Sequence, residues 1–180
     1  MRLALKLHPD SLGSAVTRVE AEAVRRGTGG LVLSYFVTGR TSELRLPPRA
    51  VATRTDELWQ HTCFEAFVCS SSEAGYYEFN FAPSTQWAAY RFSAYRNGMG
   101  IATEISGPRV EFQSASEHCA LQASLDRDRI NLPGDSPWRL GLSAIIEETS
   151  GRKSYWALAH PPGKPDFHHP DCFAYQLLQT

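Results

Sequence analysis

Four side chains with chemical or binding potential stand at every second position of one segment: Trp59, His61, Cys63 and Glu65. In an extended strand, residues two apart project from the same face. An indole, an imidazole, a thiol and a carboxylate would therefore share one surface. Glu78 and Asn80 repeat the two-residue spacing beyond a Ser/Gly turn. This combination predicts a binding face rather than a core face.

A tryptophan beside carboxylate, carboxamide and guanidinium groups suits a sugar. The ring takes the apolar C–H face of a pyranose, while the polar groups pair with its hydroxyls. Trp59 would supply one ring and Trp156 a second, and Arg91 could add a guanidinium. Both tryptophans could instead fill the core, where large aromatic side chains dominate burial. Arg91 could likewise do no more than neutralise Glu78 or Glu65.

Glu65 and Glu78 also resemble the carboxylate pair of a glycosidase, in which one group acts as acid and the other as base or nucleophile. A hydrolytic role for these two residues is therefore an alternative. Carboxylates in β-proteins are more commonly hydrogen-bond acceptors, so we expect no chemical turnover.

A metal or haem site is a further alternative. Imidazole and thiolate groups suit zinc or copper. Adjacent histidines in a strand point to opposite faces, however, so we assign no metal ligands and no cofactor. Met99 could ligate haem iron together with a histidine, although a lone methionine usually fills a gap. The sequence does not decide whether a structural calcium ion is bound. The residues considered as zinc or copper ligands are His61, Cys63, His160, His168 and His169.

Composition narrows the functional classes. The chain has 180 residues, 42% of them hydrophobic, which is typical of one domain, here 1–180, with a real core. Its net charge of −1 and scattered basic residues argue against nucleic acid as a partner. No apolar segment approaches bilayer length and no signal peptide is evident, so we expect a cytoplasmic protein without membrane contact. The oligomeric state is left open.

Short β-branched and aromatic runs, separated by Gly, Pro, Ser or Asp clusters, indicate an all-β domain. A single sheet of ten strands would leave one apolar face exposed to water. The pattern therefore favours a two-sheet antiparallel β-sandwich. The predicted strands are Leu3 to Leu7, Val16 to Val24, Leu31 to Val37, Thr62 to Cys69, Tyr76 to Ala82, Trp87 to Phe92, Arg109 to Gln113, Ala120 to Asp126, Leu140 to Glu148 and Ser154 to Ala159.

Two further expectations concern orientation. In the segment from Tyr76 to Phe81, the odd-numbered aromatic residues should face the space between the sheets. Glu78 and Asn80 should then face the opposite surface. The stretch from His160 to Cys172 contains four prolines and must be a loop, because proline removes ladder donors. This loop, with Phe167, His168 and His169, could cover one end or face of the sandwich.

Three blocks in this order resemble the bacterial DOMON-like proteins: LWQHTCFEAFV, YYEFNFAPSTQWAAYRFSAYRNGM and SYWALAHPPGKPDFHHPDCF. These proteins are similar to family-9 carbohydrate-binding modules and to haem-binding DOMON domains. The resemblance extends from about Leu31 to Leu177. It implies a two-sheet β-sandwich, in agreement with the strand pattern.

The resemblance also implies a set of ligand-binding residues. Family-9 modules have a tryptophan followed six residues later by a glutamate, as in Trp59 and Glu65. Glu78 with Asn80 stands where those modules have an arginine and an asparagine, and Lys153 with Trp156 stands where they have an Asn-x-x-Trp unit. The changed residues leave the sugar specificity open. The haem-binding branch implies Met99 with His160 or His168 as axial ligands.

We therefore expect a non-catalytic protein that binds a small polar ligand, most plausibly a sugar or sugar derivative. The expected ligand-binding residues are Trp59, Glu65, Glu78, Asn80, Lys153 and Trp156, with His61, Arg91 and His168 as possible additions.

Overall fold

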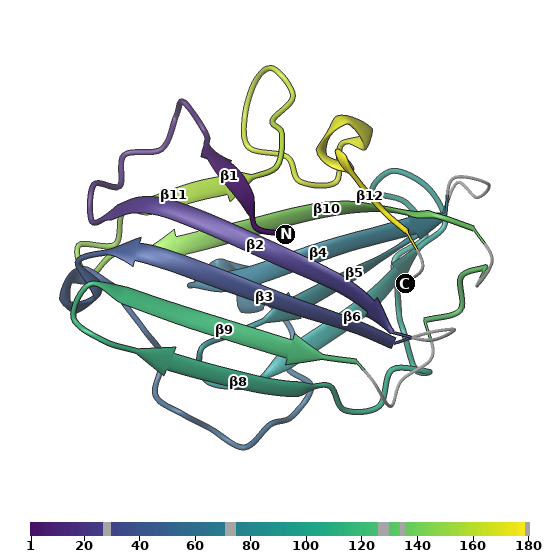
Figure 1. Cartoon of the computed structure of the whole chain (residues 1–180), viewed down its shortest axis with the longest axis horizontal. Helices are drawn as coiled ribbons and strands as arrows, with labels where there is room; N and C mark the ends of the chain where they lie inside the picture. Colours follow the sequence, from purple (N-terminus) through teal and green to yellow (C-terminus); the bar gives the residue numbers. More distant parts are fainter. Residues whose placement is uncertain (27–29, 71–74, 126–129, 134–135, 179–180) are drawn as a thin grey trace.

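A computed structural model describes residues 1–26, 30–70, 75–125, 130–133 and 136–178 of the chain (Figure 1). Within these ranges the chain forms twelve β-strands, three short 3₁₀ helices and no α-helix. All pairs of these strands are antiparallel. The predicted all-β antiparallel fold is confirmed. No helix in the described ranges is long and apolar enough to cross a membrane.

The strands form one curled sheet that folds over itself into two layers (Figure 1). Sheet A has the order β1 (Leu3–Leu7), β2 (Val16–Arg26), β3 (Gly30–Gly39), β9 (His118–Ser124) and β8 (Arg109–Ser114). Sheet B has the order β7 (Gly100–Ile101), β6 (Trp87–Phe92), β5 (Tyr76–Phe81), β4 (Cys63–Ser70), β10 (Trp138–Glu147) and β11 (Lys153–Ala157), and β12 (Tyr175–Leu177) also pairs with β10.

Strand β1 joins the two sheets. Its first residues pair with β2 in sheet A, and its last residues, Lys6 and Leu7, pair with β11 in sheet B. The two layers of the predicted sandwich are therefore continuous along one side rather than separate sheets. This continuity gives both β2 and β11 a hydrogen-bonding partner where each would otherwise have a free edge.

The main core lies between the two layers. It contains Tyr35 and Leu33 from sheet A and Phe64, Phe79 and Trp138 from sheet B, all fully buried. In β5 the alternation is as predicted: Tyr77, Phe79 and Phe81 belong to this core.

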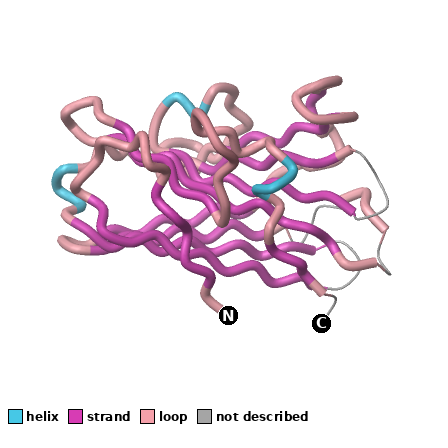
Figure 2. Tube along the Cα trace, turned by 90° about the horizontal axis from the view of Figure 1, so that it is seen from above, coloured by secondary structure: helices cyan, strands magenta, loops and turns pink. Residues whose placement is uncertain are grey.

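A second apolar cluster covers the outer face of sheet B. It combines Phe67, Tyr76 and Phe92 from the strands with Phe167 and Phe173 from the C-terminal loop. Seen from above, connecting loops lie over one outer side of the strands (Figure 2). The predicted proline-rich loop therefore covers a face of the sheet, and both faces of β4 and β5 are buried.

The structure differs from the predicted elements in a few places. Trp59 and His61 lie outside β4, because Leu58–Gln60 forms the 3₁₀ helix η2 and the strand begins at Cys63. Two short strands, β7 and β12, were not predicted. Asp126, at the end of a predicted strand, lies outside the described residues. The other helices are η1 (Thr41–Glu43) and η3 (Pro170–Cys172).

Candidate functional site

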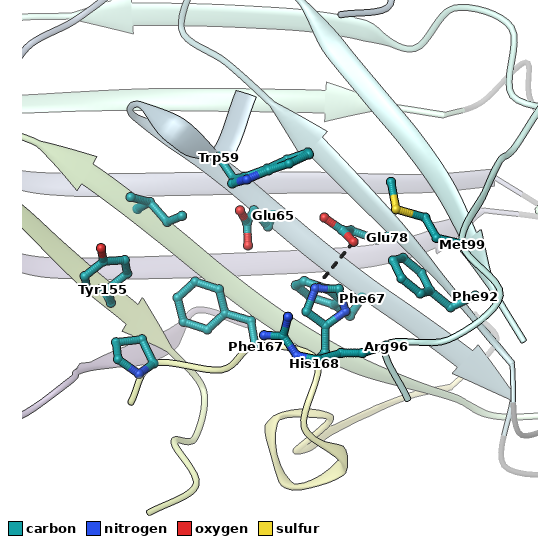
Figure 3. A pocket seen from close by; sticks show the side chains of 12 residues that line it. Trp59, Glu65, Phe67, Glu78, Phe92, Arg96, Met99, Tyr155, Phe167 and His168 are labelled. Atoms are coloured by element: carbon teal, nitrogen blue, oxygen red, sulfur yellow. Dashed lines mark ion pairs between the residues drawn. The ribbon is translucent and has the colours of Figure 1, made fainter. Parts of the chain in front are cut away.

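A cavity of about 430 Å³ lies on the outer face of sheet B (Figure 3). Its floor comes from β4, β5, β6, β10 and β11, and its walls come from η2, the turn after β6 and the C-terminal loop. Met99 and Arg96 at its margin are exposed, so the cavity connects to solvent. The lining residues are Trp59, Glu65, Phe67, Glu78, Phe92, Arg96, Met99, Ile145, Tyr155, Pro165, Phe167 and His168.

Two glutamates occupy the floor of this cavity. The register of β4 and β5 places Glu65 opposite Asn80, and Glu78 opposite Phe67. Glu65 and Glu78 are therefore diagonal neighbours on one face of the sheet, close enough for their charges to interact. Figure 3 shows both carboxyl groups pointing into the cavity.

Glu65 is 3% exposed, and its carboxyl group has a single hydrogen bond among the described residues, in which the Ser143 hydroxyl donates to Oε2 over 3.2 Å. Burial raises the pKa of the Glu65 carboxyl well above its ordinary value, and the nearby Glu78 carboxylate raises it further. The bond from Ser143 opposes this shift only in part. Glu65 is therefore a carboxyl group that holds its proton to unusually high pH.

Glu78 is oriented by Asn80, which lies two residues further along β5 on the same face. The fully buried Asn80 side chain donates from Nδ2 to Glu78 Oε1 over 2.8 Å. Burial raises the pKa of Glu78, while the bond from Asn80 and the charge of Arg96 act in the opposite direction. Asn80 does not line the cavity, so the structure gives it a positioning role.

His168 forms the wall beside Glu78. Its Nδ1 lies 2.8 Å from the hydroxyl of Tyr76, which in turn accepts a hydrogen bond from the Arg96 backbone N–H over 3.2 Å. Because the Tyr76 hydroxyl already accepts from Arg96, we assign it as the donor to Nδ1, which places the proton of a neutral imidazole on Nε2. That Nε2–H lies 3.7 Å from Glu78 Oε2.

Burial, followed by the charge of Arg96, lowers the pKa of His168 to about 4. The imidazole is therefore neutral near pH 7. The contact with Glu78 that Figure 3 marks is 3.7 Å, longer than a hydrogen bond, and it is an ion pair only when the imidazole is protonated. A ligand hydroxyl between them could accept from Nε2–H and interact with Oε2.

The turn after β6 is tied to the C-terminal loop through Asp166. Arg96 donates to Asp166 Oδ1 from Nη2 over 2.7 Å, and the Tyr95 hydroxyl donates to Oδ2. Although burial opposes the change, these bonds hold the pKa of Asp166 below its ordinary value. Asp166 also accepts from the His168 backbone N–H over 3.2 Å. This network fixes two walls of the cavity relative to each other.

Trp59 forms the opposite wall. Glu57 has a left-handed backbone (φ 62°) that turns the chain into η2, and Trp59 in η2 packs edge to face against Tyr90 with ring centroids 6.2 Å apart. Figure 3 shows the indole lying across the cavity near the two carboxyl groups. A left-handed, non-glycine backbone is costly and often marks a functional segment.

The structure does not bring Trp156 into the cavity. Trp156 is 5% exposed, lies in the core between the sheets, and donates from Nε1 to the Ser154 hydroxyl over 3.0 Å. The alternation of β11 points Tyr155, not Trp156, toward the cavity. The expectation of two convergent indole rings is therefore wrong, because the sequence places two aromatic residues side by side on opposite faces.

Three other expected residues lie outside the cavity lining. Lys153 donates to the backbone carbonyl of Gln60 over 2.6 Å and so fastens the end of η2. His61 is exposed and pairs with Glu147 over 2.7 Å. Arg91 is exposed and lies 3.5 Å from Glu104. Of the nine expected residues, Trp59, Glu65, Glu78 and His168 line the cavity.

Several lining residues were not assigned to the site from sequence. Tyr155 could have been found once Trp156 was given to the core, because neighbours in a strand face opposite sides. Phe167 and Arg96 lie in irregular segments, where the sequence carries no periodic signal.

The donor set does not fit haem well. Met99 and His168 line the same cavity, as an axial pair would. However, haem carries anionic propionates, and the cavity holds two buried carboxyl groups while its one arginine is bound to Asp166. Among the described residues no group of three or more His, Cys, Asp or Glu could hold a metal ion.

The carboxyl pair also lacks one property of a glycosidase. Such enzymes place one carboxyl group where its pKa is raised and the other where it stays ionised. Here burial raises the pKa of both carboxyl groups, strongly for Glu65 and less for Glu78, so the surroundings of neither one lower its pKa as those of an ionised nucleophile or base would. The arrangement is suited to hydrogen bonding.

Solved structures share this fold. No protein-family model and no curated protein matches the chain. A "putative carbohydrate-binding protein" from Bacteroides uniformis is similar over 95% of this chain and 83% of that chain, with 13% identity and a TM-score of 0.68. A family-9 carbohydrate-binding module from Caldicellulosiruptor kristjanssonii, in complex with cellotriose, is similar over 89% of this chain and 75% of that chain, with 12% identity and a TM-score of 0.51. The fold is therefore like that of a family-9 module.

Proposed function

We propose that this protein binds a carbohydrate in the cavity on sheet B, without chemical turnover. The observation that carries the proposal is the position of the Trp59 indole beside two buried carboxyl groups in a cavity open to solvent. An aromatic wall and a few convergent polar groups are typical of small-molecule sites. A sugar ring presents the matching pair of surfaces, apolar C–H groups and outward hydroxyls.

Different side chains would provide the apolar contacts and the hydrogen bonds to the sugar. Trp59 and Tyr155 provide apolar walls for a pyranose ring. Glu65 and Glu78, when protonated, both donate and accept, as a sugar hydroxyl does. His168 offers its Nε2–H beside Glu78, which allows one hydroxyl to contact both residues.

The fold likeness supports this proposal. A family-9 module of similar fold is solved in complex with cellotriose, and the Bacteroides uniformis protein is described as a "putative carbohydrate-binding protein". The motifs shared with DOMON-like proteins lead us to propose a relation to that group as well. The altered positions, with Glu78 in place of an arginine, mean that the ligand need not be the same sugar.

Tryptophan fluorescence tests the proposal. Trp59 lines the cavity, whereas Trp87, Trp138 and Trp156 are buried. A bound sugar should change the emission of the protein, and Trp59→Phe should remove the change while Trp87→Phe retains it. A wild-type spectrum that no member of a broad panel of neutral, acidic and amino sugars alters would contradict sugar binding.

Turnover is tested separately with aryl glycosides. Glu65 and Glu78 line one cavity, which is the observation that keeps hydrolysis as a second candidate. We expect no release of the aryl group. Release that vanishes in Glu65→Gln would replace the binding proposal with a hydrolase.

A further inference from the structure

Two carboxyl oxygens in the cavity have no hydrogen-bond partner in the described part of the chain. Glu65 uses Oε2 for Ser143, which leaves Oε1 free, and Glu78 uses Oε1 for Asn80, which leaves Oε2 with only the 3.7 Å contact to His168. The two glutamates are 3% and 6% exposed. Both oxygens face a cavity that is open to solvent, so they are available to accept hydrogen bonds from a ligand that donates to both.

The cavity has little positive charge to balance these groups. Among the described lining residues, Arg96 is the cation, and its guanidinium is engaged by Asp166. His168 is neutral near pH 7. A ligand that brings its own positive charge would therefore meet two carboxyl groups with no competing protein cation between them.

The walls also suit a cation. Trp59, Phe67, Phe92, Tyr155 and Phe167 line the cavity around the two carboxyl groups. The negative face of an aromatic ring attracts an ammonium group, most strongly when water is excluded. Buried acids within aromatic walls form an environment that favours an amine over a neutral hydroxyl.

We propose that the ligand is an amine-bearing sugar whose ammonium group lies between Glu65 and Glu78, with its ring against Trp59. This inference rests on the proposed carbohydrate binding and names the class of sugar. It follows from the unpaired oxygens, the engaged Arg96 and the aromatic walls together.

Binding of an ammonium group should release a proton. In the free protein both carboxyl groups have raised pKa values, and an adjacent positive charge lowers them, so a glutamate gives up its proton to the buffer as the salt bridge forms. The titratable and charged groups around this pair are Tyr35, Cys63, Tyr76, Tyr90, Arg96, Tyr155, Asp166 and His168.

Calorimetric titration with three probes tests the proposal: D-glucosamine, D-glucose and N-acetyl-D-glucosamine. At about pH 6, where an amine of ordinary pKa is protonated, glucosamine should bind at least about tenfold more tightly than glucose. Acetylation removes the charge and should remove this preference. The heat of glucosamine binding should change with the ionisation enthalpy of the buffer, whereas the heat of glucose binding should not.

Two variants locate the effect. Glu78→Gln keeps the shape of the side chain but cannot ionise, so it should lower glucosamine affinity to that of glucose. Glu111→Gln removes one charge from an exposed position on β8 in sheet A and should leave the preference unchanged. Circular dichroism should show that both variants are folded. If Glu78→Gln does not fold, Glu65→Gln replaces it in the same titrations.

The outcomes separate this inference from the proposed function. Glucose binding as tightly as glucosamine overturns the amine preference and leaves carbohydrate binding in place. Methylammonium binding as tightly as glucosamine also overturns the inference, because the sugar ring would then contribute nothing. Failure of all three sugars, with no response in the wider panel, removes the proposed function itself.

Discussion

At the scale of single residues, the two tryptophans expected to bind the ligand together lie in different parts of the structure. Trp59 lines the cavity, whereas Trp156 lies in the core between the sheets. Trp156→Ala should lower the free energy of unfolding by about 3–5 kcal/mol, as for other large core truncations. Trp59→Ala should cost less stability but remove sugar binding. Urea unfolding and calorimetry measure both effects.

Trp156→Phe provides the matched control, because it keeps the core filled better than alanine. It should bind sugar like the wild type. Loss of binding in Trp156→Phe with retention in Trp59→Ala would place the ligand elsewhere.

His168 should make stability depend on pH. Its folded pKa of about 4 is below its ordinary value of 6.5, so between these values the unfolded chain binds a proton that the folded protein does not. Stability from this residue is present above about pH 6.5 and is lost as pH falls toward 4. The lost free energy is about 3 kcal/mol, because one pKa unit corresponds to about 1.4 kcal/mol.

His168→Gln isolates this effect. Glu65 and Glu78 have raised pKa values and act in the opposite direction, but they titrate in both proteins. Between pH 7 and pH 4.5 the wild type should therefore lose more stability in urea unfolding than His168→Gln. Equal losses would mean that the imidazole is not buried as described.

At the scale of elements, the cavity depends on the bond between the turn after β6 and the C-terminal loop. Asp166→Asn removes the charge that Arg96 and Tyr95 bind. Because these groups are partly exposed, the cost in stability should be small, about 1 kcal/mol or less. The loop carrying Phe167 and His168 should become more sensitive to proteases, and sugar affinity should fall.

The corresponding control is Asp171→Asn, in the same loop but at an exposed position outside the cavity lining. It should change neither protease sensitivity nor affinity. Unaltered proteolysis and binding in Asp166→Asn would show that the Asp166 network does not hold the walls.

The elements were largely predictable because alternation is a local property. Tyr77 and Phe79 face the core as the period of two requires. The same rule failed at Trp59, because Glu57 turns the chain into η2 and a 3₁₀ helix has a different period. It also failed to orient Tyr155 and Trp156, since two adjacent aromatic residues fit either orientation. Strands β7 and β12 are too short to leave a pattern.

The site was predictable only in part for a related reason. Glu65 and Glu78 share a face because strand periodicity places them there. Trp59 lines the same cavity from the 3₁₀ helix η2, which strand periodicity does not predict. The contributions of Arg96 and Phe167 depend on loops packed against the sheet. Sequence spacing carries no information on that packing.

At the scale of the whole molecule, β1 holds the two sheets as one. It pairs with β2 on one side and β11 on the other. Removal of residues 1–7 would expose the edges of both strands, and unpaired edges favour association between chains. We expect a lower melting temperature and larger species in size-exclusion chromatography with light scattering.

Leu7→Ala is the control for this truncation, because the Leu7 side chain is 41% exposed while its backbone still pairs with Trp156. It should remain as stable and as monodisperse as the wild type. A truncated chain that behaves the same way would show that β1 is not needed to close the sandwich.

Carbohydrate binding in the cavity can be tested by a sugar titration followed through the indole N–H signals of the four tryptophans by NMR. If carbohydrate binds in the cavity on sheet B, the Trp59 signal shifts while the signals of buried Trp138 and Trp156 stay in place. A Trp59 signal that no sugar moves, or a bound sugar that shifts only the other signals, would contradict carbohydrate binding in this cavity.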